Sequence, residues 1–237
     1  MLLAPADIDV VVTRVAIDDD TVRACAAVLA ASERRRAERF THDRDRRRFI
    51  VRRGVLRSLL SQYLRMPARD VPVNAGPLGK PALALAEPGV DLRFNYSHSN
   101  GLAVYAVAVR QEVGVDIERI RPVAEMDGIA ESILTVRERL SLEHAAEYRL
   151  EQFFHLWTAK EAVLKTTGEG LTRSPATIEI GPPTEGIRVV RGHVAWSGRC
   201  QWSITPLAVA SGFVGAVAVP RPHHGTITLE ALDYDVD

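Results

Sequence analysis

The chain has 237 residues, and its 30 Lys and Arg residues balance its 30 Asp and Glu residues, so its formal net charge is zero. This balance argues against a nucleic-acid-binding protein that relies on bulk positive charge. Hydrophobic residues make up 46% and charged residues 25% of the chain, as in ordinary globular proteins, which excludes the disordered and fibrous classes. Its apolar runs are all shorter than the ~18 residues that a membrane-spanning helix needs.

The first residues and the two cysteines carry no sign of export. The segment Met1–Asp7 has no basic residue ahead of its short apolar stretch, so we expect no secretory signal and a cytoplasmic location. Cys25 and Cys200 lie far apart without the spacing of a metal site, and a disulfide framework needs more cysteines. We expect both to be buried as small hydrophobic residues.

An Arg-rich segment comes first in chain order. Between residues 34 and 57 the arginines are opposed only by Glu38, Asp43 and Asp45. Apolar residues spaced for a helix run through the same segment: Phe49, Ile50, Leu56, Leu59 and Leu60. The segment therefore predicts a helix with a cationic surface that favours an anionic ligand. The alternative is a solvated helix face that uses Arg where other proteins use Lys.

A polar break follows at residues 94–101 and contains Ser97, His98 and Ser99. Adjacent Ser and His residues do not make a catalytic dyad, because a triad is defined by its geometry. The chain has no Gly-x-Ser-x-Gly elbow, no Walker-type phosphate loop, no Rossmann fingerprint and no zinc-type spacing. These absences remove the common hydrolase and nucleotide-binding families.

Two apolar runs of strand length resemble each other. Residues 101–109 are echoed by residues 212–219, and each run begins with a glycine. A helical apolar stripe precedes each run, and the second stripe consists of Phe153, Phe154, Leu156, Trp157, Val163 and Leu164. The pattern predicts two comparable α+β units that meet near residues 110–114, although Ala- and Val-rich strands also look alike by composition alone.

Acidic residues alternate along the predicted strand at residues 114–118. This alternation places Asp116 and Glu118 on one face of the strand and Val115 and Ile117 on the other. Two neighbouring carboxylates repel each other, so we expect them to be solvated, to meet cations or to share a hard metal ion. The alternative is a surface acidic pair that bridges to nearby arginines.

The helix predicted at residues 154–165 carries Glu161 and Lys165 four residues apart on one face. An ordinary intrahelical ion pair is one interpretation. The other is that Glu161 joins Asp116 and Glu118 in a three-carboxylate site, while Lys165 meets a ligand phosphate. The chain has only three lysines, Lys80, Lys160 and Lys165, and such scarcity favours a specific contact for each.

Four short motifs occur together in a defined order: residues 79–81 (Gly-Lys-Pro), 95–99 (Asn-Tyr-Ser-His-Ser), 114–118 (Gly-Val-Asp-Ile-Glu) and 154–165. In this order and spacing they closely resemble the motif set of the Sfp-type 4′-phosphopantetheinyl transferases, over roughly residues 32–175. The resemblance implies an α+β fold of two similar halves related by pseudo-two-fold symmetry, with the active site at their interface.

The resemblance implies that the chain transfers the 4′-phosphopantetheine arm of coenzyme A to a serine of an apo acyl or peptidyl carrier protein and releases adenosine 3′,5′-bisphosphate. We expect residues 1–112 to contact the phosphates and adenine of coenzyme A, and residues 113–237 to hold the metal and the carrier. The residues that match Mg²⁺ ligands are Asp116, Glu118 and Glu161, and Glu161 also matches the general base. Those that match coenzyme A contacts are Lys80, Pro81, Ser97, His98, Lys165, Arg36, Arg48 and Arg53.

We expect the carrier protein to dock on residues 120–142, where Ile129, Ile133 and Leu134 are interspersed with Arg137 and Arg139. The alternative is an amphipathic helix packed on its own core. We expect a monomer with no nucleic-acid or membrane partner. Residues 188–237 offer no motif beyond predicted strands, and the Arg-, Ala- and Val-rich composition leans towards secondary metabolism in a GC-rich bacterium.

Two other functions are alternatives: a non-catalytic carrier-protein or nucleotide binder on the same scaffold, and a different magnesium-dependent phosphotransferase that acts on a small anion. A non-catalytic binder requires a broken metal site, whereas this chain retains all three carboxylates and Lys165.

Overall fold

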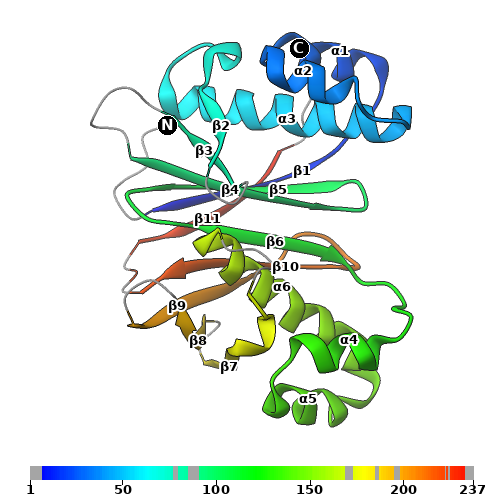
Figure 1. Ribbon diagram of the computed structural model, residues 1–237, viewed down its shortest axis with the longest axis vertical. Helices are drawn as coiled ribbons and strands as arrows, with labels where there is room; N and C mark the ends of the chain where they lie inside the picture. Colours follow the sequence, from blue (N-terminus) through cyan, green and yellow to red (C-terminus); the bar gives the residue numbers. More distant parts are fainter. Residues whose placement is uncertain are drawn as a thin grey trace.

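A computed structural model describes residues 7–76, 80–84, 91–168, 173–184, 187–194, 198–221, 223 and 225–232. Two β-sheets lie face to face, and helices cover the outer face of each sheet (Figure 1). The fold is therefore α+β, as the sequence predicted.

The first sheet has the strand order β11-β1-β5-β4. Its strands are β1 (Ile8–Arg14), β4 (Leu92–Ser99), β5 (Leu102–Val109) and β11 (Ile227–Leu232). The turn between β4 and β5 consists of Asn100 and Gly101, which both have positive φ, at 43° and 88°. Asn-Gly is the favoured pair for such a two-residue hairpin turn, so this sequence fixes the β4–β5 register.

The last strand, β11, pairs in parallel with β1, so the C-terminal end of the chain returns to the first sheet. The predicted division into 1–112 and 113–237 did not provide for this crossing, because no sequence signal links two strands more than 200 residues apart. β11 lies beside β1 through the pairs Ile8↔Ile227 to Thr13↔Leu232.

Helices α1 (Asp19–Ala27), α2 (Ala31–Ala37) and α3 (Asp43–Leu64) cover the first sheet. The apolar stripe predicted on α3 is confirmed, since Phe49, Ile50, Leu56, Leu59 and Leu60 are all buried. Cys25 of α1 is also buried, as expected, whereas the Cys200 side chain lies outside the described part of the chain.

The second sheet is antiparallel and has the strand order β6-β10-β9-β8-β7. Its strands are β6 (Gly114–Arg119), β7 (Ile178–Thr184), β8 (Ile187–Val194), β9 (Gly198–Leu207) and β10 (Phe213–Pro220). Its outer face carries the helices α4 (Met126–Ile133), α5 (Val136–Glu143) and α6 (Arg149–Thr167). Shorter elements are η1 (Ala68–Asp70), β2 (Val73–Ala75), β3 (Pro81–Leu83), η3 (Ala146–Tyr148) and η5 (Pro175–Thr177).

Three hydrophobic clusters separate these layers. One lies between α1–α3 and the first sheet, one between the two sheets, and one between the second sheet and α4–α6. The predicted apolar runs 101–109 and 212–219 form β5 and β10, each of which is buried on both faces. Burial on both faces explains why these strands read as continuous apolar runs without polar alternation.

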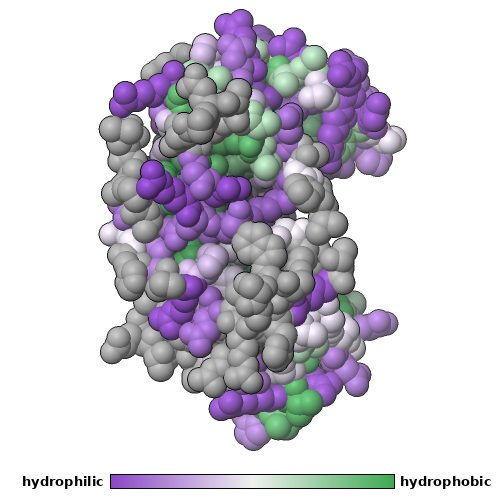
Figure 2. All heavy atoms as spheres, turned by 60° about the vertical axis from the view of Figure 1, so that its left-hand side comes forward, coloured by the Kyte–Doolittle hydropathy of each residue, from purple (hydrophilic) through white to green (hydrophobic). Residues whose placement is uncertain are grey.

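The apolar residues expected on the carrier-docking surface face inward instead. Ile133 and Leu134 are only 7% and 2% exposed and belong to the core under α6, and Ile129 packs against the same core. The alternative, a helix packed on its own core, is therefore correct for these residues. The exposed apolar residues of this region are Val136 and Leu140 on α5, at the lower end of the molecule, where Figure 2 shows hydrophobic among hydrophilic side chains. None of the described helices is both long and apolar enough to cross a membrane.

Candidate active site

The site lies along a seam between β4, an edge strand of the first sheet, and β6, an edge strand of the second (Figure 1). Side chains of β4 connect the two strands. Asn95 Oδ1 accepts the Val115 N–H at 3.0 Å, Ser97 Oγ donates to Asp116 Oδ1 at 2.7 Å, and Ser99 Oγ donates to Glu118 Oε2 at 2.7 Å. Residue numbers rise together on both strands, so β4 and β6 run in parallel with side-chain bridges between them.

The alternation of β6 directs its carboxylates away from the core between the sheets. Val115 and Ile117 are fully buried there, so Asp116 and Glu118 face the side on which α6 lies. Gly114 allows α6 to approach, because a Cβ atom at this position would lie 2.0 Å from the Ala162 carbonyl oxygen. The first residue of the predicted Gly-Val-Asp-Ile-Glu motif thus has a packing role.

Lys165, Ser97 and Asp116 form one hydrogen-bonded cluster. Lys165 Nζ lies 2.6 Å from Asp116 Oδ1 and 2.9 Å from Ser97 Oγ. Asp116 is 4% exposed, so its carboxylate is shielded from water. The attraction between Asp116 and Lys165 is therefore stronger than that of an ion pair at the surface. The Lys165 ammonium reaches across to β6, and the described ion pairs do not include the intrahelical pair with Glu161 that was the alternative interpretation.

Glu161 and Glu118 lie close enough to Asp116 for its negative charge to affect their pKa values. Burial, followed by the negative charge of Asp116, raises the pKa of Glu161 above its ordinary value. Burial also raises the pKa of Glu118, with a further contribution from Asp116, while the hydrogen bond from Ser99 opposes the shift. The three predicted carboxylates therefore share one electrostatic environment.

Within the described ranges, no group of three or more His, Cys, Asp or Glu residues has the arrangement of a metal site. Two buried carboxylate oxygens in the seam nevertheless lack a hydrogen-bond partner, Asp116 Oδ2 and Glu161 Oε1. Buried carboxylate oxygens without donors, in a group that already repels itself, are what a hard divalent cation satisfies. These residues therefore fit Mg²⁺ by their donor atoms and by their charge.

His98 follows Ser97 on β4, and its side chain reaches solvent. Partial desolvation of the ring, together with the positive charges of Arg52, Lys165 and Arg48, lowers its pKa to about 4. His98 is therefore neutral near pH 7 and lies within a group of cations. Such a group suits a ligand with several phosphate charges.

Lys80 and Pro81 lie beside the C-terminal end of α6. Lys80 Nζ lies 2.7 Å from Glu112 Oε2 and donates to the Thr166 carbonyl oxygen at 3.0 Å. Pro81 begins β3 and pairs with Ala75 of β2. Gly79, the first residue of this motif, falls outside the described part of the chain.

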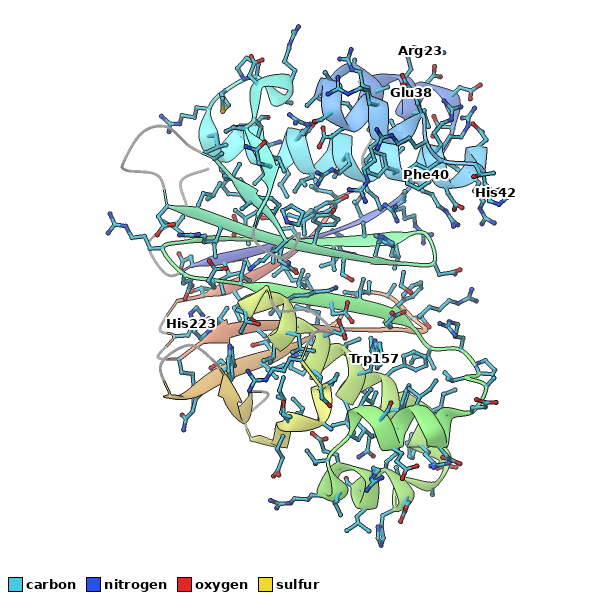
Figure 3. The ribbon with its side chains drawn as sticks, in the orientation of Figure 1. Arg23, Glu38, Phe40, His42, Trp157 and His223 are labelled. Carbon is cyan, nitrogen blue, oxygen red and sulfur yellow. The ribbon has the colours of Figure 1, made fainter. Side chains whose placement is uncertain are left out.

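The three arginines expected to bind coenzyme A are dispersed. Arg48 lies close enough to His98 to affect its pKa, whereas Arg53 is in a buried ion pair, with its Nε 3.0 Å from Glu33 Oε1. Arg36 stacks over the Phe49 ring at 5.3 Å. It also lines a separate cavity of about 560 Å³ with Ser32, Arg35, Arg39 and Phe40. Phe40 lies at the end of the helical layer where α3 begins (Figure 3).

Comparison with known proteins identifies the family. Residues 112–218 match a family model described as the 4′-phosphopantetheinyl transferase superfamily, and residues 18–110 match a model of a 4′-phosphopantetheinyl transferase N-terminal region. The 4′-phosphopantetheinyl transferase HetI of Nostoc sp. is 37% identical over 198 residues, which cover 82% of this chain and 79% of HetI. The chain belongs to the 4′-phosphopantetheinyl transferase family. The Sfp-type resemblance of its motifs is thereby confirmed.

Two further matches are more distant. The transferase is 29% identical over 146 residues to the 4′-phosphopantetheinyl transferase Sfp of Bacillus subtilis, a match that covers 61% of this chain and 62% of Sfp. A crystal structure of the holo-[acyl-carrier-protein] synthase of Thermotoga maritima matches with a TM-score of 0.36 and 24% identity, over 46% of this chain and 62% of that one.

Two residues of the candidate site were not predicted from the sequence. Arg52 lies near His98 and precedes Arg53 in the same helix, and its position four residues after Arg48, on one helix face, is a signal for it. Ser99 hydrogen-bonds Glu118, and its spacing of two from Ser97 on one strand face is the corresponding signal.

Proposed function

We propose that this transferase moves the 4′-phosphopantetheine moiety of coenzyme A to the serine hydroxyl of an apo acyl or peptidyl carrier protein, with release of adenosine 3′,5′-bisphosphate. The observation that carries the proposal is the cluster of Lys165, Ser97 and Asp116 in the seam, beside the carboxylates of Glu118 and Glu161. Binding of a diphosphate needs both a divalent cation and a fixed positive charge. In this seam the carboxylates can bind the cation, and Lys165 supplies the fixed charge.

Asp116, Glu118 and Glu161 would hold Mg²⁺. Support comes from the partnerless oxygens of Asp116 and Glu161 and from the mutual repulsion of the three carboxylates. When bound, Mg²⁺ supplies positive charge to the diphosphate oxygens of coenzyme A.

Glu161 would act as the general base. In the metal-free protein, burial and then the charge of Asp116 raise its pKa. With Mg²⁺ bound, one of its oxygens would face the carrier serine and accept the proton. It accepts the proton of the carrier serine while the serine oxygen bonds to the phosphorus of the phosphopantetheine group. The bond from that phosphorus to the departing phosphate of adenosine 3′,5′-bisphosphate breaks in the same step, so the electron pair leaves with the nucleotide.

Lys165 and the cations around His98 would bind the anionic parts of coenzyme A. Lys165 can exchange part of its contact with Asp116 for a diphosphate oxygen, because its side chain is 26% exposed. Arg48 and Arg52 lie near His98 and suit the 3′-phosphate. We retain Lys80, Pro81, Arg36 and Arg53 as candidate contacts, although Arg53 and Lys80 already pair with carboxylates.

The proposed arrangement of the molecule is two similar halves, 1–112 and 113–237, related by pseudo-two-fold symmetry. Its support is that each sheet carries one long helix, α3 or α6, on its outer face, and that the two family models meet between residues 110 and 112. We propose that the protein acts as a cytoplasmic monomer and that the carrier docks on the segment 120–142. The exposed apolar residues Val136 and Leu140 support this surface, since Ile129, Ile133 and Leu134 pack inward.

Mass spectrometry of the carrier tests the function. The protein is incubated with coenzyme A, MgCl₂ and an apo carrier protein, and the carrier is then weighed. We expect a gain equal to one phosphopantetheine group, no gain in EDTA, and no gain with Asp116→Ala. A carrier that stays unmodified, with both proteins shown to be folded, contradicts the enzyme and supports a non-catalytic binding protein.

A further inference from the structure

Ser99 ends β4 and has a hydroxyl group with two defined partners. Ser99 Oγ donates to Glu118 Oε2 at 2.7 Å and accepts the backbone N–H of Arg119 at 3.1 Å. Both partners belong to β6, whereas Ser99 belongs to the first sheet. The residue therefore contacts the second sheet at the position of one proposed metal ligand.

The direction of these hydrogen bonds is fixed by chemistry. A hydroxyl has one proton, and a backbone N–H can only donate. Because the Arg119 N–H points at Ser99 Oγ, the Ser99 proton is free to point at the Glu118 carboxylate, which can only accept when ionised. Ser99 thus holds one Glu118 oxygen by a hydrogen bond from its own hydroxyl group.

The same arrangement occurs two residues earlier on both strands. Ser97 Oγ accepts from Lys165 Nζ and donates to Asp116 Oδ1, so its proton is also directed at a carboxylate. Ser97 to Asp116 and Ser99 to Glu118 have the same separation in sequence, 19 residues. One face of β4 thus provides one hydroxyl donor for each of the two β6 carboxylates.

Glu118 needs such a donor more than Asp116 does. Asp116 is 4% exposed and is also held by Lys165, whereas Glu118 has a longer side chain and is only partly buried. The rotatable bonds of the longer side chain also allow rotamers that turn the Glu118 carboxylate away from the seam towards solvent. A hydrogen bond from a fixed strand opposes that rotation.

We infer that Ser99 is a positioning residue, which holds the Glu118 carboxylate in the seam so that it is available to Mg²⁺ when the ion binds. The inference rests on the proposed function, because it takes Glu118 to be a ligand of Mg²⁺. Partners of metal ligands commonly contribute 10- to 100-fold to metal affinity by fixing the orientation of the ligand. Ser99 acts from the opposite sheet, so the docking of the two sheets orients the ligand.

A pair of variants with the same shape isolates the hydroxyl. Ser99→Thr keeps a hydroxyl at this position, and Ser99→Val has the same size and branching without it; both are good strand residues. Ser61→Ala is the control, because Ser61 is also partly buried and its hydroxyl donates at 2.7 Å to a backbone carbonyl, that of Ser58 on α3.

Two measurements are made on each full-length variant: the affinity of the free protein for Mn²⁺ by electron paramagnetic resonance, and the dependence of carrier modification on Mg²⁺ concentration. For Ser99→Val we expect Mn²⁺ affinity about tenfold weaker. The half-saturating Mg²⁺ concentration should rise by a similar factor, while kcat at saturating Mg²⁺ stays within about twofold. Ser99→Thr and Ser61→Ala should match the wild type in both measurements.

The outcomes separate this inference from the proposed function. If Ser99→Val binds Mn²⁺ as tightly as Ser99→Thr does, or if Ser99→Val lowers kcat at every Mg²⁺ concentration with unchanged Mn²⁺ affinity, the positioning role is wrong and the proposed function stands. If the wild type modifies the carrier equally well in EDTA, the metal itself is wrong and the positioning role fails with it. If the wild type never modifies a carrier but Ser99→Val still loses Mn²⁺ affinity, only the proposed function fails.

Discussion

Glu161 is the residue on which the proposed chemistry depends most. Its carboxylate is pushed towards protonation by burial and by Asp116, and one of its oxygens has no hydrogen-bond partner. An ionised side chain in such surroundings lowers the stability of the folded protein, and a residue that does so is typical of a functional site. Its replacement should therefore separate activity from stability.

We expect Glu161→Gln to lower transfer at least ~100-fold, because the base is lost, and to raise the melting temperature at pH 7 without metal. The folded pKa of Glu161 lies above its unfolded value, so the ionised form destabilises the fold at every pH above the folded pKa. The gain in melting temperature should shrink as the pH falls through that pKa. Scanning fluorimetry between pH 4 and 8 measures it.

Glu143→Gln is a suitable control, because Glu143 is an exposed residue at the end of α5. It should change neither activity nor the pH profile of the melting temperature. A Glu161→Gln variant that melts below the wild type at every pH would show that Glu161 contributes a stabilising interaction.

The pKa of His98 should report on anion binding in the seam. Its pKa is about 4 in the free protein because of partial desolvation and the nearby cations Arg52 and Lys165. Bound adenosine 3′,5′-bisphosphate brings negative charge to these cations, so we expect the pKa of His98 to rise and the nucleotide to bind more tightly as the pH falls towards the raised pKa. Imidazole NMR titrations with and without the nucleotide measure this shift.

The signals of His144, which is exposed at the C-terminal end of α5, are the control and should not respond to the nucleotide. If the pKa of His98 is the same in both titrations, the nucleotide binds elsewhere. The cavity lined by Arg35, Arg36 and Arg39 is then the site to examine.

At the scale of elements, a buried ion pair anchors α6 to its surroundings. Lys160 Nζ lies 2.7 Å from Glu138 Oε2 and donates to the carbonyl oxygens of Pro175 and Ile178, at 3.0 and 2.6 Å. Glu138 in turn accepts the backbone N–H groups of Thr135 and Ile180, each at 2.8 Å. The pair thus ties α5, η5 and β7 to the helix that carries Glu161.

We expect Lys160→Met to lower the free energy of unfolding by ~3–5 kcal/mol, because it leaves the Glu138 carboxylate buried without its cation. Urea denaturation measures the loss. The double variant Lys160→Met, Glu138→Gln should recover part of it, since neither charge then remains in the core. A loss below ~1 kcal/mol in the single variant would show that water or another donor replaces the ammonium.

The helices and strands that the sequence predicts well are those with a regular local pattern. The stripe of α3 and the apolar runs of β5 and β10 follow directly from burial, and the alternation of β6 correctly separates Asp116 from Val115. The inward packing of Ile133 and Leu134 was not predictable, because a short amphipathic helix has the same pattern whether its apolar face meets its own core or a partner.

Contacts between residues far apart in the chain were not predictable for a related reason. The Arg-rich pattern of α3 is similar for Arg48, Arg52 and Arg53, yet Arg53 pairs with Glu33 and the other two approach His98. The packing of α2 against α3 decides which arginine pairs with Glu33, and the local sequence pattern does not reveal that packing. The bridges from Ser97 and Ser99 to β6 likewise depend on how the two sheets dock.

At the scale of the whole molecule, the return of β11 to β1 restricts how the seam can move. The chain passes from the first sheet to the second between β5 and β6, and passes back between β10 and β11. Separation of the sheets would therefore strip β11 from β1 or break the three side-chain bridges between β4 and β6. The two sheets should therefore behave as one rigid body, and the seam should bind its ligand without a hinge opening to admit it.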